Sequence, residues 1–292
     1  MSRIGILLAG GTGSRLWPIT LGVSKQVLAV YDKPQFYYAL STLMLADIRE
    51  ICIVTNPENT EVYASYFGDG SEIGMTLHYV SQKEPRGIAD AFNVCKQYIQ
   101  NKKCALILGD NIFIGNELTR DLTNPSLNDY GATLFVQEVS NPSAYGVIEY
   151  KENGEIGKII EKPVNAPSNH AVTGLYFYDE NVSYFAAQLT PSSRGELEIT
   201  DLNNIYLKNG ELNAQKFGRG HIWFDTGNPR DLLDAGNLVE ILQRRTNLMI
   251  GCPEEIAFQK NWITGDALIA LSRKYAKTNY GIYLKGLATC SA

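Results

Sequence analysis

A glycine-rich turn follows the first apolar segment of the chain. It comprises Leu8-Ala9-Gly10-Gly11-Thr12-Gly13-Ser14-Arg15-Leu16. Glycines in such a turn let backbone N–H groups approach phosphate oxygens closely. The turn is not a Walker A loop, because the Gly-Lys-Ser/Thr ending is missing, and Leu16 stands where a dinucleotide fingerprint has its third glycine. Arg15 and Lys25 follow the glycines, and two such cations suit a triphosphate whose pyrophosphate must leave.

Two carboxylates are placed where they could bind a metal ion. Asp110 follows the apolar segment Leu106-Ile107-Leu108-Gly109, and Asp225 follows Trp223-Phe224. At the carboxyl end of a strand in a parallel sheet, Asp110 would lie beside the glycine-rich turn. Two Asp residues far apart in sequence can converge on one Mg²⁺, which prefers a few carboxylates together with phosphate oxygens and water. Taken singly, each of them is more commonly a turn or helix-capping residue.

Two glutamines offer the groups that a pyrimidine base requires. The amide of Gln26 or Gln82 provides one donor and one acceptor, which match the O and N–H edge of thymine or uracil. Gly87 would allow the backbone to approach the base. Uracil lacks only the 5-methyl group, which contributes about 1 kcal/mol in an apolar pocket. These residues therefore leave the choice between dTTP and UTP open.

The composition limits the classes of partner. A net charge of −5 over 292 residues argues against nucleic-acid or membrane-surface binding, because both depend on a basic face. None of the five cysteines forms a CxxC pair, and Cys52 and Cys104 fall in apolar runs, which is typical of buried reduced thiols. The sequence has no leader-like N-terminus and no apolar run near the ~20 residues of a membrane span. We therefore expect a cytoplasmic protein.

Strand-like and helix-like segments alternate through the first half of the chain. The expected strands are Arg3–Leu8, Ile51–Thr55, Met75–Val80, Cys104–Leu108 and Ala132–Val136, and the expected helices begin at Pro34 or cover Glu58–Phe67 and Arg86–Ile99. This βαβα alternation implies a mostly parallel sheet covered by helices, with ligands at the carboxyl ends of the strands.

The second half is more mixed. A hairpin is expected where Gly146–Tyr150 and Ile156–Ile160 flank Glu152-Asn153-Gly154. A further strand is expected at Ala171–Tyr178, and helices at Val182–Leu189, Ile199–Lys208, Arg230–Leu242 and Asp266–Tyr275. We predict one α/β domain with a smaller α+β portion and a helical C-terminal tail, divided at about residues 110 and 228.

In this order the motifs resemble the signature of the sugar nucleotidylyltransferases. Gly10-Gly11-x-Gly13-x-Arg15-Leu16 with Lys25 carries the resemblance, which extends from Gly5 to about Leu284. Longer strings are similar to those of the short, tetrameric glucose-1-phosphate thymidylyltransferases that feed dTDP-L-rhamnose synthesis. Among them are Val23-Ser24-Lys25-Gln26, Tyr31-Asp32-Lys33-Pro34, Leu108-Gly109-Asp110-Asn111-Ile112-Phe113 and Cys252-Pro253-Glu254-Glu255-Ile256-Ala257-Phe258. Arg86 and Ala29 depart from the family's pattern, which leaves the base preference open.

The resemblance implies a Rossmann-like nucleotidyltransferase fold and an activity. The activity is nucleotidylyl transfer from dTTP to α-D-glucose 1-phosphate, which gives dTDP-glucose and pyrophosphate with Mg²⁺ as cofactor. Asp110 and Asp225 would bind the metal, Arg15 and Lys25 the triphosphate, and Lys162 the attacking phosphate. The other implied nucleotide-binding residues are Leu8, Gly10, Gly11, Gly13, Ser14, Gln26, Gln82 and Gly87, with Asp110 also in this set. The implied sugar-phosphate pocket comprises Tyr145, Gly146, Glu161, Lys162, Val172 and Arg194.

The same resemblance implies an assembly and its regulation. It indicates a homotetramer with a regulatory nucleotide site near Cys252–Phe258 and Arg219, where dTDP-rhamnose could inhibit. Residues 1–110 would then form the nucleotide-binding part, 111–228 the sugar-phosphate-binding part, and 229–292 the helical tail with the regulatory or interface segment.

Other interpretations of these motifs remain. A glycosyltransferase usually has an Asp-x-Asp metal motif, but Gly109-Asp110-Asn111-Ile112 has one Asp. A nicotinamide oxidoreductase would require the missing third glycine. A non-catalytic homologue would be expected to lack at least one of the charged residues named above. The segment Glu196–Asp201 is interpreted as a loop that caps a helix, with Thr200 and Asp201 in its first turn.

Overall fold

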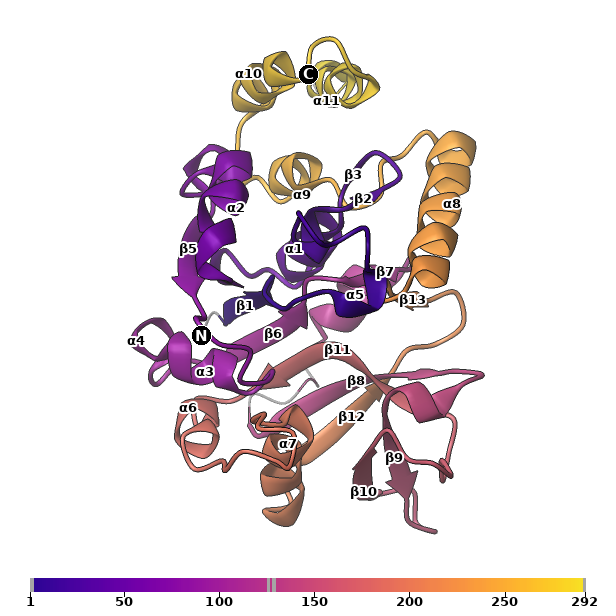
Figure 1. The fold of residues 1–292 in the computed structure, drawn as a ribbon. Coiled ribbons are helices and arrows are strands. Elements are labelled where there is room, and N and C mark those ends of the chain that lie inside the picture. The colour runs from indigo at the N-terminus through magenta and orange to yellow at the C-terminus, as the bar shows by residue number, and fades with distance from the viewer. Residues whose placement is uncertain (1–2, 125–126, 128–129, 291–292) are drawn as a thin grey trace.

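A mixed β-sheet forms the centre of the computed structural model, which describes residues 3–124, 127 and 130–290. In these residues the sheet has nine strands, and seven of them follow the order β10-β9-β11-β6-β1-β4-β5 (Figure 1). Strands β1 (Ile4–Leu8), β4 (Glu50–Thr55), β5 (Thr76–Ser81) and β6 (Cys104–Leu108) are parallel to one another. β1 is buried along its whole length, as expected for a parallel strand that is covered on both faces.

The other half of the sheet is mainly antiparallel. Strand β11 (His170–Tyr178) runs antiparallel to β6, to β8 (Ala132–Glu138) and to β9 (Gly146–Tyr150). The predicted hairpin joins β9 to β10 (Ile156–Glu161), and Gly154 in its turn has a φ of 83°. Strand β12 (Leu212–Lys216) pairs with β8. The predicted α/β fold with a smaller α+β portion is therefore confirmed.

Alternating side chains of the parallel strands build a core on each face of the sheet. Leu7 and Ile53 pack into one cluster with residues of α1 (Gln35–Leu45). Ile6 and Val54 pack into the other with Phe92 of α3 (Asp90–Val94) and with residues of α7 (Ile199–Lys208). Successive side chains of a strand point to opposite faces, so a run of apolar residues supplies both clusters. The other helices around the sheet are α2 (Thr60–Phe67), α4 (Lys96–Ile99), α5 (Leu118–Leu122) and α6 (Val182–Ala186).

Two short ribbons lie outside the main sheet. One pairs β7 (Asn111–Ile114) with β13 (Ile222–Asp225) in antiparallel fashion, and its register sets Asp225 opposite Asn111. The other pairs β2 (Ala29–Val30) with β3 (Lys33–Pro34). The first ribbon brings two distant segments of the chain to one edge of the fold.

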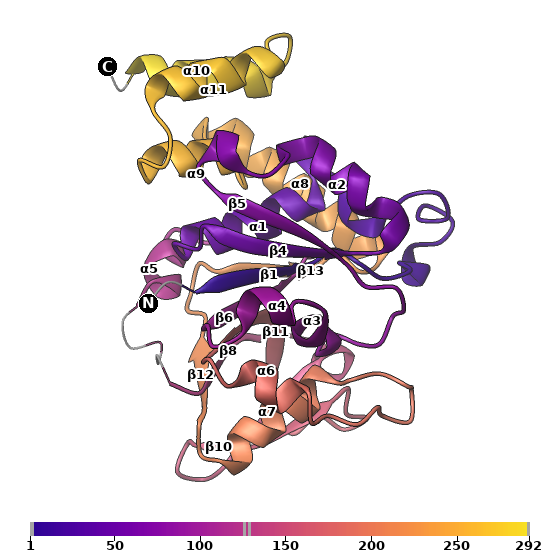
Figure 2. The same ribbon diagram turned by 90° about the vertical axis from the view of Figure 1, so that its left-hand side faces the viewer.

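The C-terminal region is helical, as predicted. It contains α8 (Pro229–Thr246), α9 (Pro253–Gln259), α10 (Gly265–Lys274) and α11 (Asn279–Cys290). Helices α10 and α11 lie side by side at one end of the molecule, beyond α9 (Figures 1 and 2). In the part of the chain that the structure describes, no helix is long and apolar enough to span a membrane.

The predicted helix over Arg86–Ile99 is wrong at its start. Residues 86–89 form a loop, because Leu197 donates its backbone N–H to the carbonyl of Arg86 at 2.7 Å and Gly87 adopts a φ of 98°. The helix begins only at Asp90 and is interrupted at Cys95. The helix expected over Val182–Leu189 ends at Ala186. The elements that were not predicted are β2, β3, β7, β12, β13, α5, α9 and α11.

Candidate active site

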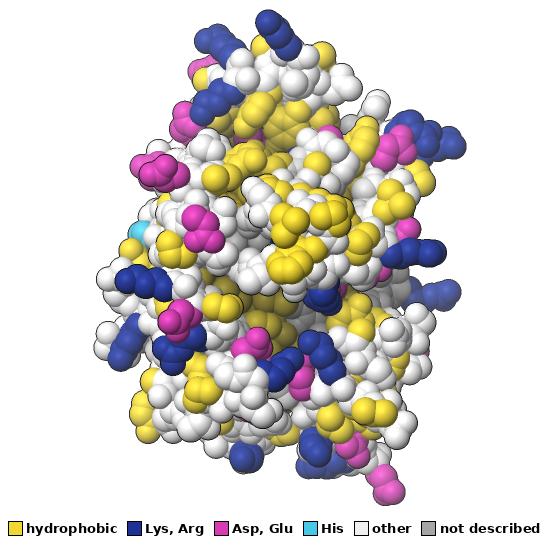
Figure 3. Space-filling view, in the orientation of Figure 1, with side chains coloured by type: hydrophobic (Ala, Val, Ile, Leu, Met, Phe, Trp, Pro, Cys, Tyr) yellow, Lys and Arg dark blue, Asp and Glu magenta, His cyan; other side chains and the backbone are white. Residues whose placement is uncertain are grey.

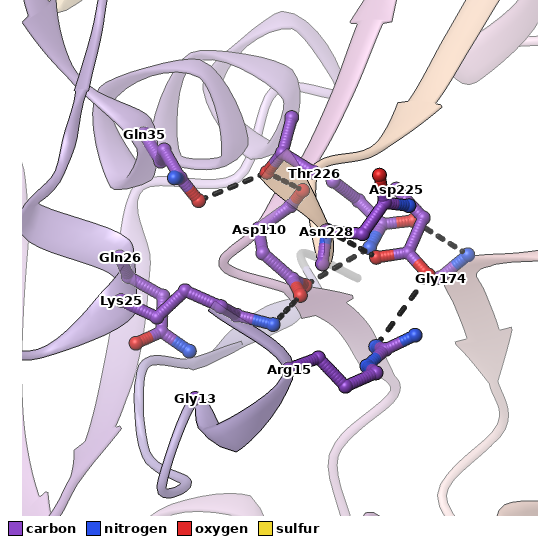
Figure 4. A network of polar contacts seen from close by, with 12 residues as sticks. Gly13, Arg15, Lys25, Gln26, Gln35, Asp110, Gly174, Asp225, Thr226 and Asn228 are labelled. Atoms are coloured by element: carbon purple, nitrogen blue, oxygen red, sulfur yellow. Dashed lines mark hydrogen bonds and ion pairs between the residues drawn. The ribbon is translucent and has the colours of Figure 1, made fainter. Parts of the chain in front are cut away.

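The predicted phosphate-binding and metal-binding residues meet at the carboxyl ends of β1 and β6. Figure 4 shows Arg15, Lys25, Asp110 and Asp225 directed toward one another, although they come from three separate parts of the chain. Figure 3 shows that the molecule is hollowed across the middle of its face, and charged side chains gather along the edge of the hollow. This location agrees with the rule that ligands of open α/β sheets bind outside the carboxyl ends of the strands.

A few specific contacts fix the conformation of the glycine-rich turn. Gly13 has a φ of 60°, and a Cβ there would lie 3.2 Å from the Cβ atoms of Lys25 and Thr20. The hydroxyl of Thr20 donates to the Gly13 carbonyl at 2.8 Å. Gly10 and Gly11 follow β1, whose last residue Leu8 accepts a hydrogen bond from the backbone of Gly109, and Ser14 begins a 3₁₀ turn that carries Arg15. The turn thus positions backbone N–H groups and Arg15 at the same edge.

Asp110 is a buried carboxylate with an adjacent cation. Lys25 donates to its Oδ2, and Asn111 Nδ2 donates to its Oδ1 at 3.0 Å. Burial by itself would raise the pKa of Asp110, but the charge and hydrogen bond of Lys25 and the hydrogen bond of Asn111 leave it lowered. Asp110 is therefore ionised at neutral pH.

The pKa of Asp225 is raised, whereas that of Asp110 is lowered. Its Oδ2 lies 3.8 Å from a guanidinium nitrogen of Arg15, whose side chain is 63% exposed. Burial, followed by the negative charge of Asp110, raises the pKa of Asp225 to about 6, although Arg15 and Lys25 oppose the shift. The two carboxylates are thus close enough to repel each other. The nearby cations do not fully compensate this repulsion.

Thr226 fixes these two carboxylates relative to each other. Its backbone N–H and its hydroxyl both donate to the backbone carbonyl of Asp110, at 3.1 and 2.7 Å. The Asp110 and Asp225 segments are therefore joined by main-chain contacts as well as by the β7–β13 pairing.

The donor set fits a Mg²⁺ ion that is shared with phosphate groups. A divalent cation between the two carboxylates would offset the repulsion by which Asp110 raises the pKa of Asp225. In the described residues there is no group of three or more His, Cys, Asp and Glu side chains that could hold a metal ion. A site with few protein ligands is typical of Mg²⁺, which keeps water and substrate phosphates as its other ligands.

The pKa of Asp225 predicts a pH-dependent cost to the ligand-free fold. Because the folded pKa of about 6 exceeds the ordinary value of 3.8, this cost is absent below pH 3.8, grows through the interval and is complete above pH 6. D225N should therefore raise the free energy of unfolding by about 2 to 3 kcal/mol at pH 7.5 in metal-free buffer, and by almost nothing near pH 3.5. Denaturant titrations at the two pH values measure the difference. If wild type and D225N had equal free energies of unfolding at pH 7.5, Arg15 would already neutralise Asp225.

The two glutamines have different surroundings. The Nε2 of Gln26 donates to the Gly10 carbonyl at 2.9 Å, and Ser24 donates to its Oε1 at 2.9 Å, so in the ligand-free chain this amide braces the glycine-rich turn. Gln82 follows β5, and its Nε2 donates to Asp90 at 2.9 Å. A Cβ on Gly87 would lie 2.5 Å from the Leu197 carbonyl oxygen, so close packing also requires a glycine there.

The predicted sugar-pocket residues gather around the end of β10. A Cβ on Gly146 would lie 3.3 Å from Glu161 Oε2 and 3.9 Å from the Cβ of Val172. Lys162 has a φ of 41°, which is costly for a non-glycine residue, and its backbone N–H donates to the Tyr145 carbonyl at 3.0 Å. Strain of this kind is common where a side chain is aimed at a ligand.

Three further residues of this pocket were missed by sequence reasoning. Thr200 donates to Glu161 Oε2 at 2.8 Å. Trp223 packs on Tyr145, with ring centroids 4.9 Å apart, and donates its indole N–H to Asn111 Oδ1 at 2.6 Å. Asn111 also accepts from the backbone N–H of Gly174 at 3.1 Å, and so links the sugar pocket to Asp110. Asn111 directly follows Asp110 and Trp223 lies two residues before Asp225, which is the signal that could have identified them.

Arg194 is engaged with carboxylates of its own segment. It contacts Glu198 at 2.8 Å and Glu196 at 3.7 Å. Burial raises the pKa of Glu198, but hydrogen bonds from Arg194 and Ser192 and the charges of Arg194 and Lys162 leave it lowered. The expectation that Thr200 and Asp201 lie in the first turn of a helix is confirmed, but no side chain caps that helix.

Known proteins resemble this chain over almost its whole length. The pattern of the nucleotidyl transferase family matches residues 4–241. The chain is 48% identical over 286 residues to a glucose-1-phosphate thymidylyltransferase of Xanthomonas campestris, covering 98% of this chain and 97% of the relative. It is 49% identical over 280 residues to the enzyme of the same name from Neisseria meningitidis, covering 96% and 97%.

Solved structures of similar proteins share this fold. A crystal structure from Bacillus anthracis, described as a glucose-1-phosphate thymidylyltransferase in complex with sucrose, has a TM-score of 0.75 at 39% identity and covers 81% of this chain and 95% of that one. A UDP-glucose pyrophosphorylase in complex with UDP-glucose has a TM-score of 0.72 at 27% identity, covering 83% and 100%. The fold, the site and these relatives lead to one conclusion: the chain belongs to the nucleotidyl transferase family, within the group of the glucose-1-phosphate thymidylyltransferases.

Proposed function

We propose that this chain transfers a thymidylyl group from dTTP to α-D-glucose 1-phosphate and so forms dTDP-glucose and pyrophosphate. The observation that carries the proposal is the convergence of Lys25 and Arg15 on Asp110 and Asp225 beside the glycine-rich turn. A phosphate cradle, two cations and two carboxylates are the components that phosphoryl-group chemistry requires. Relatives of about 48% identity that carry this activity in their names support the choice of substrates.

The proposed reaction is an in-line displacement at the α-phosphorus of dTTP. A phosphate oxygen of the sugar phosphate attacks, the bond between the α-phosphorus and the oxygen that bridges to the β-phosphorus breaks, and pyrophosphate leaves with both electrons of that bond. The nucleophile is already an anion at neutral pH, so no general base is needed. Catalysis then consists of positioning and charge neutralisation.

The residue roles follow from this chemistry. Lys25 and Arg15 would exchange their carboxylate partners for the triphosphate, and Arg15 would stabilise charge on the leaving pyrophosphate. Lys162, at the end of β10, would orient the attacking phosphate, and Glu161 would accept hydrogen bonds from sugar hydroxyls. Mg²⁺ held by Asp110 and Asp225 would neutralise phosphate charge. The backbone of the glycine-rich turn would contact the other phosphate oxygens.

The wider setting is also a proposal. We infer that the product supplies dTDP-L-rhamnose or another dTDP-deoxysugar, that the enzyme works in the cytoplasm as a homotetramer, and that dTDP-rhamnose inhibits it near α9 and Arg219. The division into a nucleotide-binding part (residues 1–110), a sugar-phosphate-binding part (111–228) and a helical tail (229–292) belongs to the same proposal.

Pyrophosphate release tests the function directly. Purified protein with Mg²⁺ and glucose 1-phosphate should release pyrophosphate fastest with dTTP, more slowly with UTP, and much more slowly, but measurably, with CTP, ATP and GTP. Between dTTP and dUTP, which one methyl group separates, the difference should be roughly tenfold or less. Omitting the sugar phosphate should abolish release. If none of the nucleotides gave pyrophosphate release, the result would contradict the proposal. Cleavage of a nucleotide sugar instead would support a glycosyltransferase.

A further inference from the structure

A buried carboxylate lies behind the glutamine that would contact the base. Asp90 is the first residue of α3 and only 4% exposed. Gln82 Nε2 donates to its Oδ2 at 2.9 Å, and Asn93 Nδ2 donates to its Oδ1 at 3.4 Å. Each carboxylate oxygen of Asp90 therefore faces an amide donor. None of the chemical roles above uses this residue.

Gln82 and Asp90 are held in place by rigid surroundings. The backbone N–H of Gln82 donates to the Thr55 carbonyl at 2.8 Å, which fixes Gln82 at the carboxyl edge of the sheet. The loop between the two residues is fixed by Leu197, whose N–H donates to Arg86 at 2.7 Å and whose carbonyl accepts from Ala89 at 3.2 Å. The distance between Gln82 and Asp90 is thus set by the fold rather than by chance contact of mobile side chains.

The carboxylate determines which way the Gln82 amide points. A glutamine amide has a donor end and an acceptor end that differ little in shape, so a free amide can flip. A carboxylate only accepts, so Nε2 must face Asp90 and Oε1 must point away from it. In the described part of the chain, Oε1 accepts no hydrogen bond, and Gln82 retains 9% exposure at the site. Among the residues that the structure describes, Asp90 is the one acceptor of Nε2, so its second hydrogen can donate to a base.

We propose that Asp90 is a specificity-determining positioning residue, which locks the Gln82 amide in the orientation that accepts a hydrogen bond from the base. This inference rests on the proposed function, because it assumes that Gln82 contacts the base. Thymine and uracil present an N3–H donor next to a carbonyl acceptor, so the locked amide pairs with both groups. Cytosine presents an unprotonated N3 and an N4 amino group, which is the reverse pattern. A flipped amide would suit cytosine, but it would set Oε1 against a carboxylate oxygen.

The test compares three deoxynucleotides in the wild-type chain and in D90N. Asparagine can present either its oxygen or its NH₂ to Gln82, so the amide is released without loss of volume. The ratio of kcat/KM for dTTP to that for dCTP should fall by about tenfold or more. In D90N, the flipped Gln82 amide no longer sets its Oε1 against a carboxylate oxygen, so the flip is less costly. The ratio for dTTP to dUTP should stay unchanged, because these bases share the same hydrogen-bonding edge.

Two controls separate this role from a structural one. In a Q82A background, adding D90N should leave the dTTP-to-dCTP ratio unchanged, because the amide that Asp90 positions is gone. D179N replaces another buried carboxylate, which accepts from Tyr206 at 2.8 Å and from Gly131 at 3.1 Å, and should leave the ratio at the wild-type value. If D90N does not fold, D90S serves as the second variant, because a hydroxyl can also donate or accept.

The outcomes are distinct. A wild-type enzyme that uses dTTP, together with a D90N or D90S variant of unchanged dTTP-to-dCTP ratio, would overturn the inference and leave the proposed function intact. The same loss of discrimination in the presence and absence of Gln82 would also overturn it. A wild-type chain that uses no nucleotide would remove the proposed function and this inference with it. A fall in the ratio that depends on Gln82 supports the inference.

Discussion

Replacing Asp110 by asparagine should lower kcat by about a thousandfold while the protein remains folded. The substitution keeps the size of the side chain but removes the negative charge of the Asp110 carboxylate, to which Lys25 and Asn111 donate hydrogen bonds. Loss of one electrostatic group aimed at a developing charge commonly costs about 10²- to 10³-fold, and Asp110 would also lose its metal. Steady-state pyrophosphate release at saturating dTTP and Mg²⁺ measures the effect, with circular dichroism to check the fold.

A second readout links this effect to the metal. D110N should weaken Mn²⁺ binding to the dTTP complex, measured by paramagnetic resonance with Mn²⁺ in place of Mg²⁺. D179N is the matched control, because Asp179 is also a buried carboxylate but forms its hydrogen bonds elsewhere. Wild-type turnover in D110N would exclude Asp110 as a metal ligand.

Replacing Lys162 by methionine should have the second largest effect. We expect kcat/KM for glucose 1-phosphate to fall by about 10²- to 10³-fold, because a cation that orients the attacking anion is lost from the site. Methionine keeps the length of the apolar stem and, like lysine, carries a Cβ, so the backbone cost of the φ of 41° is the same in both proteins. Steady-state kinetics with varied sugar phosphate measure the loss.

The loss should be specific to the sugar phosphate. The Kd for dTTP, measured calorimetrically without sugar phosphate, should stay within about threefold of wild type, since Lys162 is not assigned to the triphosphate. K158M is the matched control, because Lys158 lies exposed on the same strand β10. A parallel loss of dTTP affinity in K162M would move Lys162 to the nucleotide side of the site.

Local sequence determined the strands of the main sheet except β12, most helices and the phosphate-binding turn. Apolar runs with small residues after them predict buried parallel strands and tight turns, because these properties depend on neighbouring residues alone. Cys104–Leu108 and Ile199–Lys208 were predicted with their observed bounds. The start of α3 was misplaced because a distant backbone segment, at Leu197, holds residues 86–89 out of the helix. No local pattern encodes such a contact.

The candidate site divides in the same way. The sequence alone named Arg15, Lys25, Asp110 and Asp225 as residues suited to phosphate and metal chemistry, because residue type, the adjoining strand and the resemblance of the motifs to a known family together indicate that role. Only the tertiary structure decided that Asp225 lies opposite Asn111, because this requires β7 and β13, more than a hundred residues apart, to pair in one register. The raised pKa of Asp225 and the hydrogen bonds of Asn111 depend on the packing around this ribbon. The Asp90–Gln82 pair depends instead on the loop that Leu197 holds between them. Such properties depend on distances between remote side chains, which the order of residues along the chain does not specify.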